Sequence, residues 1–383
     1  MPYLKYDNIR IASLVTAVPA HRQCIDIPEE LAANDRLTKT YVKQIGVQSR
    51  HISITEQTCV DIGYAAARKA LEMSSLTAAD LDGIIFATQS PDFNSGTGNA
   101  FLMHYRLGMR EDTLAFDIAL GCSSFPFSLS TCASLLQQPD MRRILLIIGD
   151  TAWPTYPTLD ELLADNRFLF GEGTSAIILE KTPAPVEEIT VSLFTDGAGY
   201  KYLYHPFVGY RNFWRRSLRA KNSDGVEFAQ RSIRNNYGVD ILHAGSLYMD
   251  GLEVTAFSTT RVVNSIKAFA EKTGKRPDEY DALVLHQANK QIVRTITKRL
   301  GLTEEQVPMS LDRYANVAGA GLTLTISDTF HDDPRDKLHL LTSAFGIGLS
   351  WGIANITIEP AVISPILLVE DDRFEEGYLQ AIP

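Results

Sequence analysis

The chain contains an internal repeat, because two segments about 200 residues apart follow the same residue pattern. In residues 81–90, and again in residues 280–289, an aspartate precedes a short apolar run that follows a helix-like segment. Short apolar runs of this kind predict buried strands. The repeating unit is far longer than the roughly 20–50 residues of a solenoid unit, so the pattern predicts a duplicated domain.

Two further pairs of segments continue the repeat in the same order. Residues 114–122 match residues 309–316, and residues 144–150 match residues 338–345. Both members of the first pair read as a strand that leads into a helix. Cys122 and Asn316 are therefore expected at corresponding strand-to-helix junctions.

Strand-like and helix-like runs alternate in both halves, which predicts two α/β units, each a largely parallel sheet faced by helices. Packed together, the duplicated α/β halves would form a five-layer αβαβα sandwich. A chain of 383 residues is long enough for two such cores. We expect residues 1–185 to form the first half and residues 186–383 the second, with an extended region at 197–245 and an extra tail after Pro360.

Composition narrows the function classes. A net charge of −10 argues against general nucleic-acid binding, which relies on a basic surface over the phosphates. No segment has the about 18 uninterrupted apolar residues of a membrane span, and the first residues lack the pattern of a signal peptide. We therefore expect a cytoplasmic protein that does not bind membranes. The four cysteines lack metal-ligand spacing, so free thiols and no metal site are expected.

Cys122 follows Gly121 at the end of a predicted strand and precedes an apolar helix. The unpaired N–H groups and the dipole of a helix N-terminus favour a thiolate, which is the nucleophilic form of cysteine. The alternative is a small buried core residue, which is the usual state of cysteine.

His286 and Asn316 complete a group of three candidate residues. His286 ends an apolar run at the carboxyl edge of a strand, where α/β folds place their sites, whereas the first copy has Ala87 and Thr88 there. Small residues surround Asn316, so a ligand can approach the backbone. The alternatives are a core histidine bonded to a backbone carbonyl and an asparagine that caps the following helix.

These three residue types together indicate a particular chemistry. A thiolate can take an acyl group from a thioester, and two neutral N–H donors can hold the oxygen of a second thioester as it becomes an enolate. That combination is typical of decarboxylative carbon–carbon condensation. A hydrolase of the Cys–His type would instead need Asn or Asp behind the imidazole and a route for water.

Several motifs resemble those of the β-ketoacyl-acyl-carrier-protein synthase III family in the thiolase superfamily. They are Gly-Cys-Ser-Ser-Phe at 121–125, Phe-Gly-Glu-Gly at 170–173, Leu-His-Gln-Ala-Asn at 285–289, Tyr-Ala-Asn at 314–316 and the glycine-rich segment 345–352. The resemblance implies a thiolase-like fold, usually a homodimer, and ping-pong chemistry between acyl-CoA and malonyl-acyl carrier protein. It implies no cofactor, since CoA and carrier-protein phosphopantetheine thioesters are the substrates.

The resemblance also assigns roles to residues. Cys122 would be the nucleophile, and His286 and Asn316 would bind the malonyl thioester carbonyl and stabilise the enolate. Backbone N–H groups of Cys122 and Ile347 would form the oxyanion hole. The further assignments are Arg50 for CoA binding, Lys298 and Arg299 for carrier-protein docking, and Phe345, Ser123, Phe125 and Phe93 for the pocket.

A basic and aromatic segment at 197–223, which includes Arg215 and Arg216, is a further candidate for carrier-protein docking or for binding CoA phosphates. The usual explanation of such a run is a charged surface loop.

The chain also departs from the family motifs. Glu172 stands where Asp is usual, Gln291 stands where a docking arginine is often found, and a Gly-Ile-Gly loop at 346–348 replaces three glycines. Some relatives carry a catalytic glutamate after the first-half strand. This chain has none there, although Asp92 lies nearby.

Two other functions stay open at this point. The first is transfer of the acyl group from Cys122 to an alcohol or amine without condensation. The second is a non-catalytic partner subunit that binds a carrier protein.

Overall fold

The computed structural model describes most of the chain. Described are residues 3–25, 44–54, 57–93, 96–151, 169–204, 247–370 and 373–374, together with the backbone of β11 (Arg219–Lys221), β12 (Glu227–Ala229), β13 (Ile233–Arg234) and β14 (Asp240–Ile241). Arg215 and Arg216, which were predicted to dock a carrier protein, lie outside the described residues.

The first half of the chain builds most of a six-stranded sheet in the order β19-β2-β8-β7-β5-β6. Its strands are β2 (Ile9–Pro19), β5 (Gly83–Ala87), β6 (Leu114–Ile118), β7 (Arg143–Asp150), β8 (Gly173–Lys181) and β19 (Leu367–Val369). β5 runs parallel to β6 and β7, while β8 runs antiparallel to both β7 and β2.

The second half builds most of a five-stranded sheet in the order β1-β9-β18-β17-β16, to which the N-terminal β1 is added. Its strands are β1 (Leu4–Tyr6), β9 (Ile189–Thr195), β16 (Ala282–Leu285), β17 (Leu338–Gly346) and β18 (Ser350–Ile358). β16 is parallel to β17, and β18 is antiparallel to β17 and β9, so the order β9-β18-β17-β16 repeats β2-β8-β7-β5. The predicted duplication is confirmed. The prediction of largely parallel sheets is wrong, because both are mixed.

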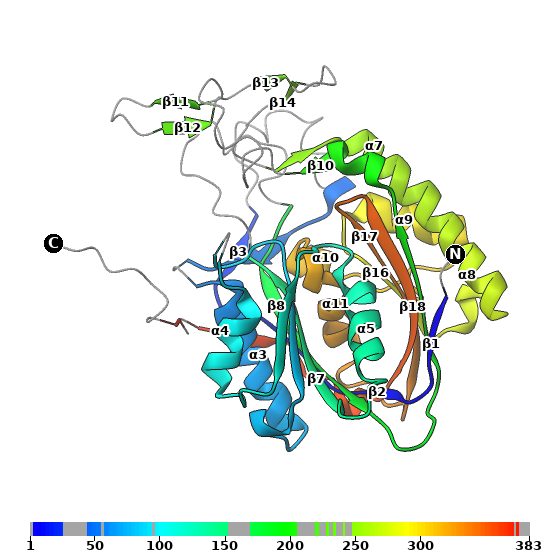
Figure 1. The fold of residues 1–383 in the computed structure, drawn as a ribbon. Coiled ribbons are helices and arrows are strands. Elements are labelled where there is room, and N and C mark those ends of the chain that lie inside the picture. Colours follow the sequence, from blue (N-terminus) through cyan, green and yellow to red (C-terminus); the bar gives the residue numbers. More distant parts are fainter. Residues whose placement is uncertain are drawn as a thin grey trace.

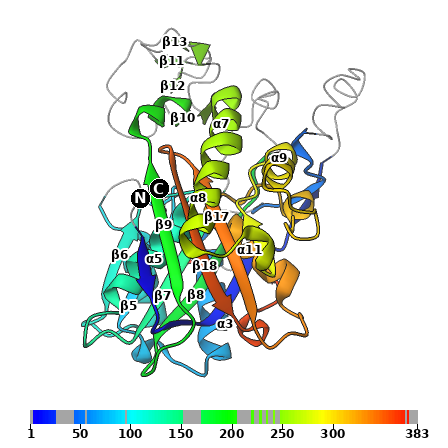
Figure 2. The ribbon, with the colours of Figure 1, turned by 90° about the vertical axis from the view of Figure 1, so that its right-hand side faces the viewer.

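Five layers are visible in Figure 1, as predicted. Helices α3 (Cys59–Met73) and α4 (Asn99–Leu107) cover the outer face of the first sheet. Helices α5 (Ser124–Leu135) and α11 (Gly321–Phe330) lie between the sheets. The outer face of the second sheet is covered by α7 (Gly251–Phe257), α8 (Val263–Thr273) and α9 (Lys290–Leu300) (Figure 2).

The middle layer explains why α5 and α11 are apolar or small on most sides. A single core cluster joins Phe125 and Leu129 of α5, Leu322 and Ile326 of α11, and residues of both sheets. A helix that is buried all round needs no polar face. Both helices therefore anchor the segments just before them, and these segments contain Cys122 and Asn316.

Two aspartates fix the alignment of the halves. Asp82 Oδ2 accepts a hydrogen bond from the Arg143 backbone N–H (3.0 Å), and Asp281 Oδ2 accepts one from the His339 N–H (2.7 Å). Each carboxylate thus joins the start of one parallel strand to its neighbour. When Asp82 is aligned with Asp281, Ala87 falls opposite His286, as the sequence predicted. When Arg143 is aligned with His339, the last residues of β7 and β17, Asp150 and Gly346, also fall opposite each other.

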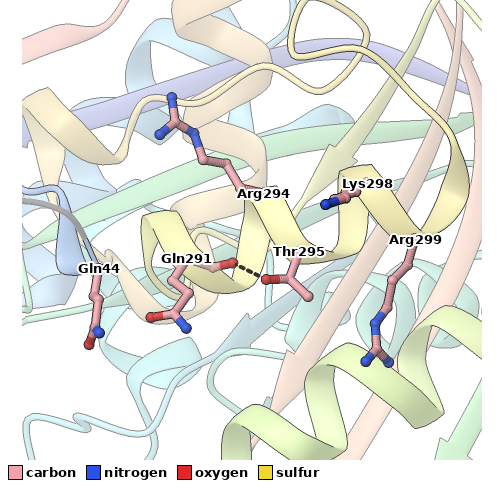
Figure 3. A pocket seen from close by; sticks show the side chains of 6 residues that line it. All are labelled: Gln44, Gln291, Arg294, Thr295, Lys298 and Arg299. Atoms are coloured by element: carbon pink, nitrogen blue, oxygen red, sulfur yellow. Dashed lines mark hydrogen bonds between the residues drawn. The ribbon is translucent and has the colours of Figure 1, made fainter.

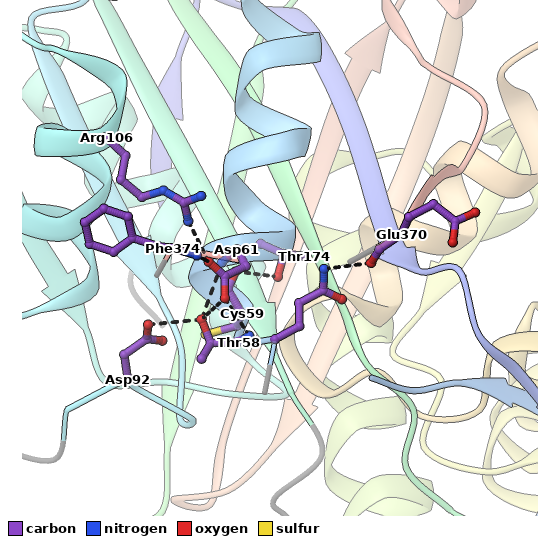
Figure 4. Close-up of polar contacts among 9 residues, drawn as sticks. Thr58, Cys59, Asp61, Asp92, Arg106, Thr174, Glu370 and Phe374 are labelled. Carbon is purple, nitrogen blue, oxygen red and sulfur yellow. Dashed lines mark hydrogen bonds and ion pairs between the residues drawn. The ribbon is translucent and has the colours of Figure 1, made fainter. Parts of the chain in front are cut away.

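The tail after Pro360 completes the edge of the first sheet. β19 pairs in parallel with β2, and beyond it the tail contacts the helices of the outer layer. Gln57 Nε2 donates to the Glu370 carbonyl (3.1 Å), and the Phe374 N–H donates to Asp61 (2.9 Å), which also pairs with Arg106 (2.7 Å) (Figure 4). Within the described ranges, no helix has the length and apolar character that crossing a membrane requires.

Candidate active site

Cys122 lies just before Ser123, the N-cap residue of α5, and its side chain faces the end of β17. A Cβ atom added at Gly346 would lie 2.5 Å from Cys122 Cβ and 3.1 Å from its Sγ. Such contacts leave no room for a side chain at position 346, so glycine lets the thiol approach the backbone. All four cysteines are free, as predicted, and Cys122 is partly exposed.

Burial, followed by the negative charge of Asp150, raises the pKa of the Cys122 thiol to about 12. The nearby backbone N–H groups of Cys122 and Ile347 act in the opposite direction and lower that pKa by a smaller amount. Cys122 thus lies at the N-terminus of α5, as predicted, while its burial favours the neutral thiol in the resting protein. The same two N–H groups are those predicted to form an oxyanion hole.

His286 directly follows β16, and its backbone N–H donates to the Ser343 carbonyl (2.9 Å). The imidazole is 2% exposed and meets the Phe345 ring edge to face, with centroids 5.5 Å apart. Its Nδ1 is buried and has no hydrogen-bond partner among the described residues. Burial lowers the pKa of His286 to about 4, so the ring is neutral near pH 7.

Asn316 is buried, and its backbone N–H and carbonyl are both hydrogen-bonded to the segment 169–171. Its N–H donates to the Leu169 carbonyl (2.9 Å), and its carbonyl accepts from the Gly171 N–H (3.1 Å). The side-chain Oδ1 accepts from the Ala318 N–H (3.0 Å), an arrangement typical of a cap. That bond leaves the Nδ2 of the carboxamide as the donor for a ligand.

The segment before Asn316 differs from the predicted strand. It contains the short helix α10 (Leu311–Tyr314) and then Ala315, whose φ of 62° and ψ of −163° lie in a region that non-glycine residues rarely adopt. Asn316 follows this strained residue and forms an isolated parallel bridge with Phe170. In the first half, β6 ends at Ile118 and a turn that includes Gly121 leads to Cys122 and α5.

Asp150, the last residue of β7, is a functional candidate that the sequence reasoning missed. Its carboxylate accepts hydrogen bonds from the Gln89 N–H (2.7 Å), the Thr88 hydroxyl (3.1 Å) and, across the halves, the Gly319 N–H (3.0 Å). Burial raises its pKa. An acidic residue at the carboxyl end of a purely apolar strand was the available signal.

The segments that carry the three predicted catalytic residues meet in the middle layer. α5 contacts both β17 and the short 3₁₀ helix η7 (Ala318–Ala320) that follows Asn316. Gly321, at the start of α11, lies next to His286, because a Cβ added there would be 3.9 Å from the imidazole Nδ1. One region therefore holds a thiol, two backbone N–H groups, a neutral imidazole and a neutral carboxamide.

The predicted pocket residues lie in different surroundings. Ser123 is buried, with its Oγ 2.7 Å from Ser350 Oγ, and Phe125 packs into the core between the sheets. Phe345 contacts His286, as described above. Phe93 lies after β5 and is 39% exposed. Their roles in acyl binding stay predictions.

Asp92 accepts a hydrogen bond from the Thr58 hydroxyl (3.0 Å; Figure 4). The Asp92 backbone N–H donates to Asn99 Oδ1 (3.0 Å). Its other carboxylate oxygen is buried without a hydrogen-bond partner in the described part of the chain. Burial raises the pKa of Asp92 to about 7. These contacts place the carboxylate at the ends of α3 and α4, in the outer layer, whereas Cys122 lies in the middle layer.

Arg50 belongs to β4 (Ser49–His51), which pairs with β3 (Arg22–Cys24). It is 8% exposed; its Nε donates to Gln23 Oε1 (2.8 Å), and its Nη1 donates to the Phe170 carbonyl (3.0 Å). The predicted CoA-binding residue therefore contacts the segment that bridges to Asn316.

Figure 3 shows a pocket of about 730 Å³ beside α9. It is lined by Gln44, Gln291, Arg294, Thr295, Lys298 and Arg299. Arg294 pairs with Glu304, and Arg299 Nη1 donates to the Thr259 carbonyl (2.6 Å). Lys298 is exposed, and its ammonium group makes no hydrogen bond or ion pair with the residues described.

Comparisons with known proteins agree with this arrangement. The family model described as 3-oxoacyl-[acyl-carrier-protein (ACP)] synthase III matches residues 116–197, and the model of the C terminal of that family matches residues 270–358. These two ranges contain Cys122, His286 and Asn316.

Two curated relatives align over nearly their full length. A putative 3-oxoacyl-acyl-carrier-protein synthase 3 of Campylobacter jejuni is 30% identical over 375 residues, which cover 96% of this chain and 99% of the relative. A β-ketoacyl-acyl-carrier-protein synthase III of Thermosynechococcus vestitus is 29% identical, with coverage of 91% and 97%. A solved 3-oxoacyl-acyl-carrier-protein synthase from Burkholderia xenovorans is 26% identical to this chain and superposes on it with a TM-score of 0.83. The superposition covers 96% of this chain and 99% of the solved chain.

Proposed function

The chain belongs to the 3-oxoacyl-acyl-carrier-protein synthase III family, and from that premise we propose that it is a condensing enzyme that loads an acyl group from acyl-CoA onto Cys122. The acyl group then condenses with malonyl-acyl carrier protein, with loss of carbon dioxide. The observation that supports this proposal is that the segments carrying Cys122, His286 and Asn316 contact one another in the middle layer, through α5, β17, η7 and α11.

In the first half-reaction, the Cys122 sulfur attacks the carbonyl carbon of acyl-CoA. The new carbon–sulfur bond displaces the CoA thiol, which takes up the proton that the cysteine loses. Negative charge develops on the carbonyl oxygen, where the N–H groups of Cys122 and Ile347 can stabilise it. Because the thiol pKa is raised, the sulfur must lose its proton as the substrate binds or reacts.

In the second half-reaction, His286 and Asn316 hydrogen-bond the thioester carbonyl of the malonyl group. The bond to the carboxylate carbon breaks, carbon dioxide leaves and the electron pair forms an enolate. Its carbon attacks the acyl-cysteine, and the Cys122 sulfur departs. Neutral donors suit this step because they stabilise the enolate oxygen without transferring a proton to it.

The surface pocket beside α9 is our candidate for the approach of the thioester carriers. Arg294, Lys298 and Arg299 place three positive charges around it on an otherwise acidic chain. Such charges favour the phosphates of CoA and phosphopantetheine as well as an acidic carrier protein. Lys298 is the most available of the three because Arg294 and Arg299 already have partners.

We further propose a homodimer that forms along β6. This strand is the free edge of the first sheet, and its unpaired backbone groups can bond to a second copy. Leu114 at its start and Phe101 and Tyr105 of the adjoining α4 are exposed. Sedimentation should give twice the 42.5 kDa of one chain, and a monomer at micromolar concentration would contradict the dimer.

Intact-protein mass after incubation with a panel of acyl-CoAs tests the proposed enzyme. We expect one acyl adduct on the wild-type chain, none on Cys122→Ala, and release of carbon dioxide when malonyl-carrier protein is added. An adduct that survives Cys122→Ala would contradict the proposal. Acylation without malonyl-dependent carbon dioxide release would favour simple acyl transfer, and no acylation would favour a non-catalytic partner.

A further inference from the structure

We propose that Arg50 is a positioning residue that holds Asn316 in place for the decarboxylation step. The proposal rests on the proposed function above. Arg50 does not need to touch a substrate for this role, because it acts through Phe170. Its guanidinium is buried, and Nη1 donates to the Phe170 carbonyl at 3.0 Å.

The parallel bridge between Phe170 and Asn316 explains how a hydrogen bond to Phe170 can fix the position of Asn316. Asn316 is bonded to the two neighbours of Phe170, through the Leu169 carbonyl and the Gly171 N–H. In a parallel bridge, the central residue points its own carbonyl away from its partner. Arg50 donates its hydrogen bond to this Phe170 carbonyl. Arg50 and Asn316 therefore bind opposite edges of the segment 169–171.

Local backbone preference does not hold Asn316 in this place. The preceding Ala315 has a positive φ of 62°, which costs on the order of 1–3 kcal/mol and persists only where the surroundings impose it. Residue 171 must also be glycine, because a Cβ there would lie 2.2 Å from the Tyr314 carbonyl oxygen. The conformation at Asn316 therefore depends on the segment that Arg50 anchors.

The chemistry of arginine suits this role. A charged donor makes a stronger hydrogen bond to a carbonyl than a neutral one, and the planar guanidinium can bond Gln23 and Phe170 at once. His51, the next residue, supports the same segment, since its carbonyl accepts from the Glu172 N–H (3.0 Å) and its ring stacks on Tyr314. The paired strands β3 and β4 thus contact the segments on both sides of the bridge.

The test separates the two half-reactions in Arg50→Met. We expect acyl-CoA loading of Cys122, measured by intact mass, to stay within about 3-fold of wild type, whereas malonyl-dependent carbon dioxide release falls about 10- to 100-fold. The matched control is Arg276→Met, which removes an exposed arginine that pairs with Asp278 and should leave both half-reactions unchanged.

Gly171→Ala attacks the same bridge without touching Arg50, and it should give the same selective loss of decarboxylation. It therefore tests the proposal even if Arg50→Met does not fold. A raised KM for acyl-CoA with normal decarboxylation would overturn the proposal in favour of a CoA contact. Equal losses in both half-reactions would also overturn it. Absence of both half-reactions in the wild-type chain would instead contradict the proposed function on which the inference rests.

Discussion

The strands β7 and β17 occupy equivalent places in the two halves, yet they end in opposite residue types. β7 ends in Asp150, whose carboxylate binds the Gly319 N–H just after Asn316. β17 ends in Gly346, against which Cys122 packs. At the end of β7, the Asp150 carboxylate thus holds the segment that follows Asn316. At the end of β17, the missing side chain of Gly346 lets the Cys122 thiol lie close to the Ile347 N–H.

The neighbouring parallel strands show the same division. β5 ends in the buried Ala87, and the equivalent position after β16 is His286. Duplication therefore explains the scaffold, and the positions where the copies differ form the site. In this account the first half provides the nucleophile, and the second half provides the donors for the enolate.

Gly346→Ala should have the largest effect, because it places a Cβ 2.5 Å from Cys122 Cβ. Displacing the sulfur from its backbone donors should slow acyl loading by at least about 100-fold. Gly251→Ala is the control, since its added Cβ would meet no atom of the other described residues within 4 Å beyond its own helix and chain neighbours. The rate of adduct formation checks this prediction, and normal loading in Gly346→Ala would show that the close approach is unnecessary.

His286 should make the stability of the protein depend on pH. Its pKa falls from the ordinary 6.5 to about 4 on folding, so the folded state resists protonation. Stability should be complete above about pH 6.5 and decrease by about 3 kcal/mol as the pH falls to about 4. His286→Ala, which copies the first half, should reduce this slope in urea unfolding at several pH values. An equal slope in both proteins would contradict the burial of a neutral imidazole.

Asp150→Asn tests the other side of the comparison with a smaller effect. One oxygen that accepts hydrogen bonds becomes an NH₂ group, so the Gly319 anchor weakens and decarboxylation should fall about 10-fold. Because the Asp150 charge raises the pKa of Cys122, its removal should shift the pH profile of thiol alkylation to lower pH. An unshifted profile would argue against the electrostatic link between the two residues.

Ala315→Gly should have the smallest effect. Glycine adopts positive φ without the steric cost of a Cβ, but it adds entropy to the unfolded chain and removes a buried methyl group. We expect a net gain of about 1 kcal/mol, seen as a Tm about 1 °C higher for a chain of 383 residues. A lower Tm would mean that the methyl contacts with Val47 and Leu311 outweigh the strain.

The sequence predicted the layers and the alignment of the halves because apolar periodicity and Asp82 and Asp281 recur in both copies. It failed before Asn316, where the repeat pattern conceals α10 and the strained Ala315. The raised pKa of the Cys122 thiol also could not be predicted, because the burial of the thiol and its closeness to Asp150 arise only in the folded structure. The same holds for Arg50, whose burial against Phe170 depends on contacts across about 120 residues of sequence.

The division of labour between the halves is tested most directly by measuring both half-reactions in Cys122→Ala and Asn316→Ala. Cys122→Ala should form no acyl adduct and still release carbon dioxide from malonyl-carrier protein. Asn316→Ala should form the adduct at a near-normal rate and lose decarboxylation by about 100- to 1000-fold. If each variant loses both half-reactions to the same extent, the assignment of Cys122 to acyl loading and of Asn316 to decarboxylation is contradicted.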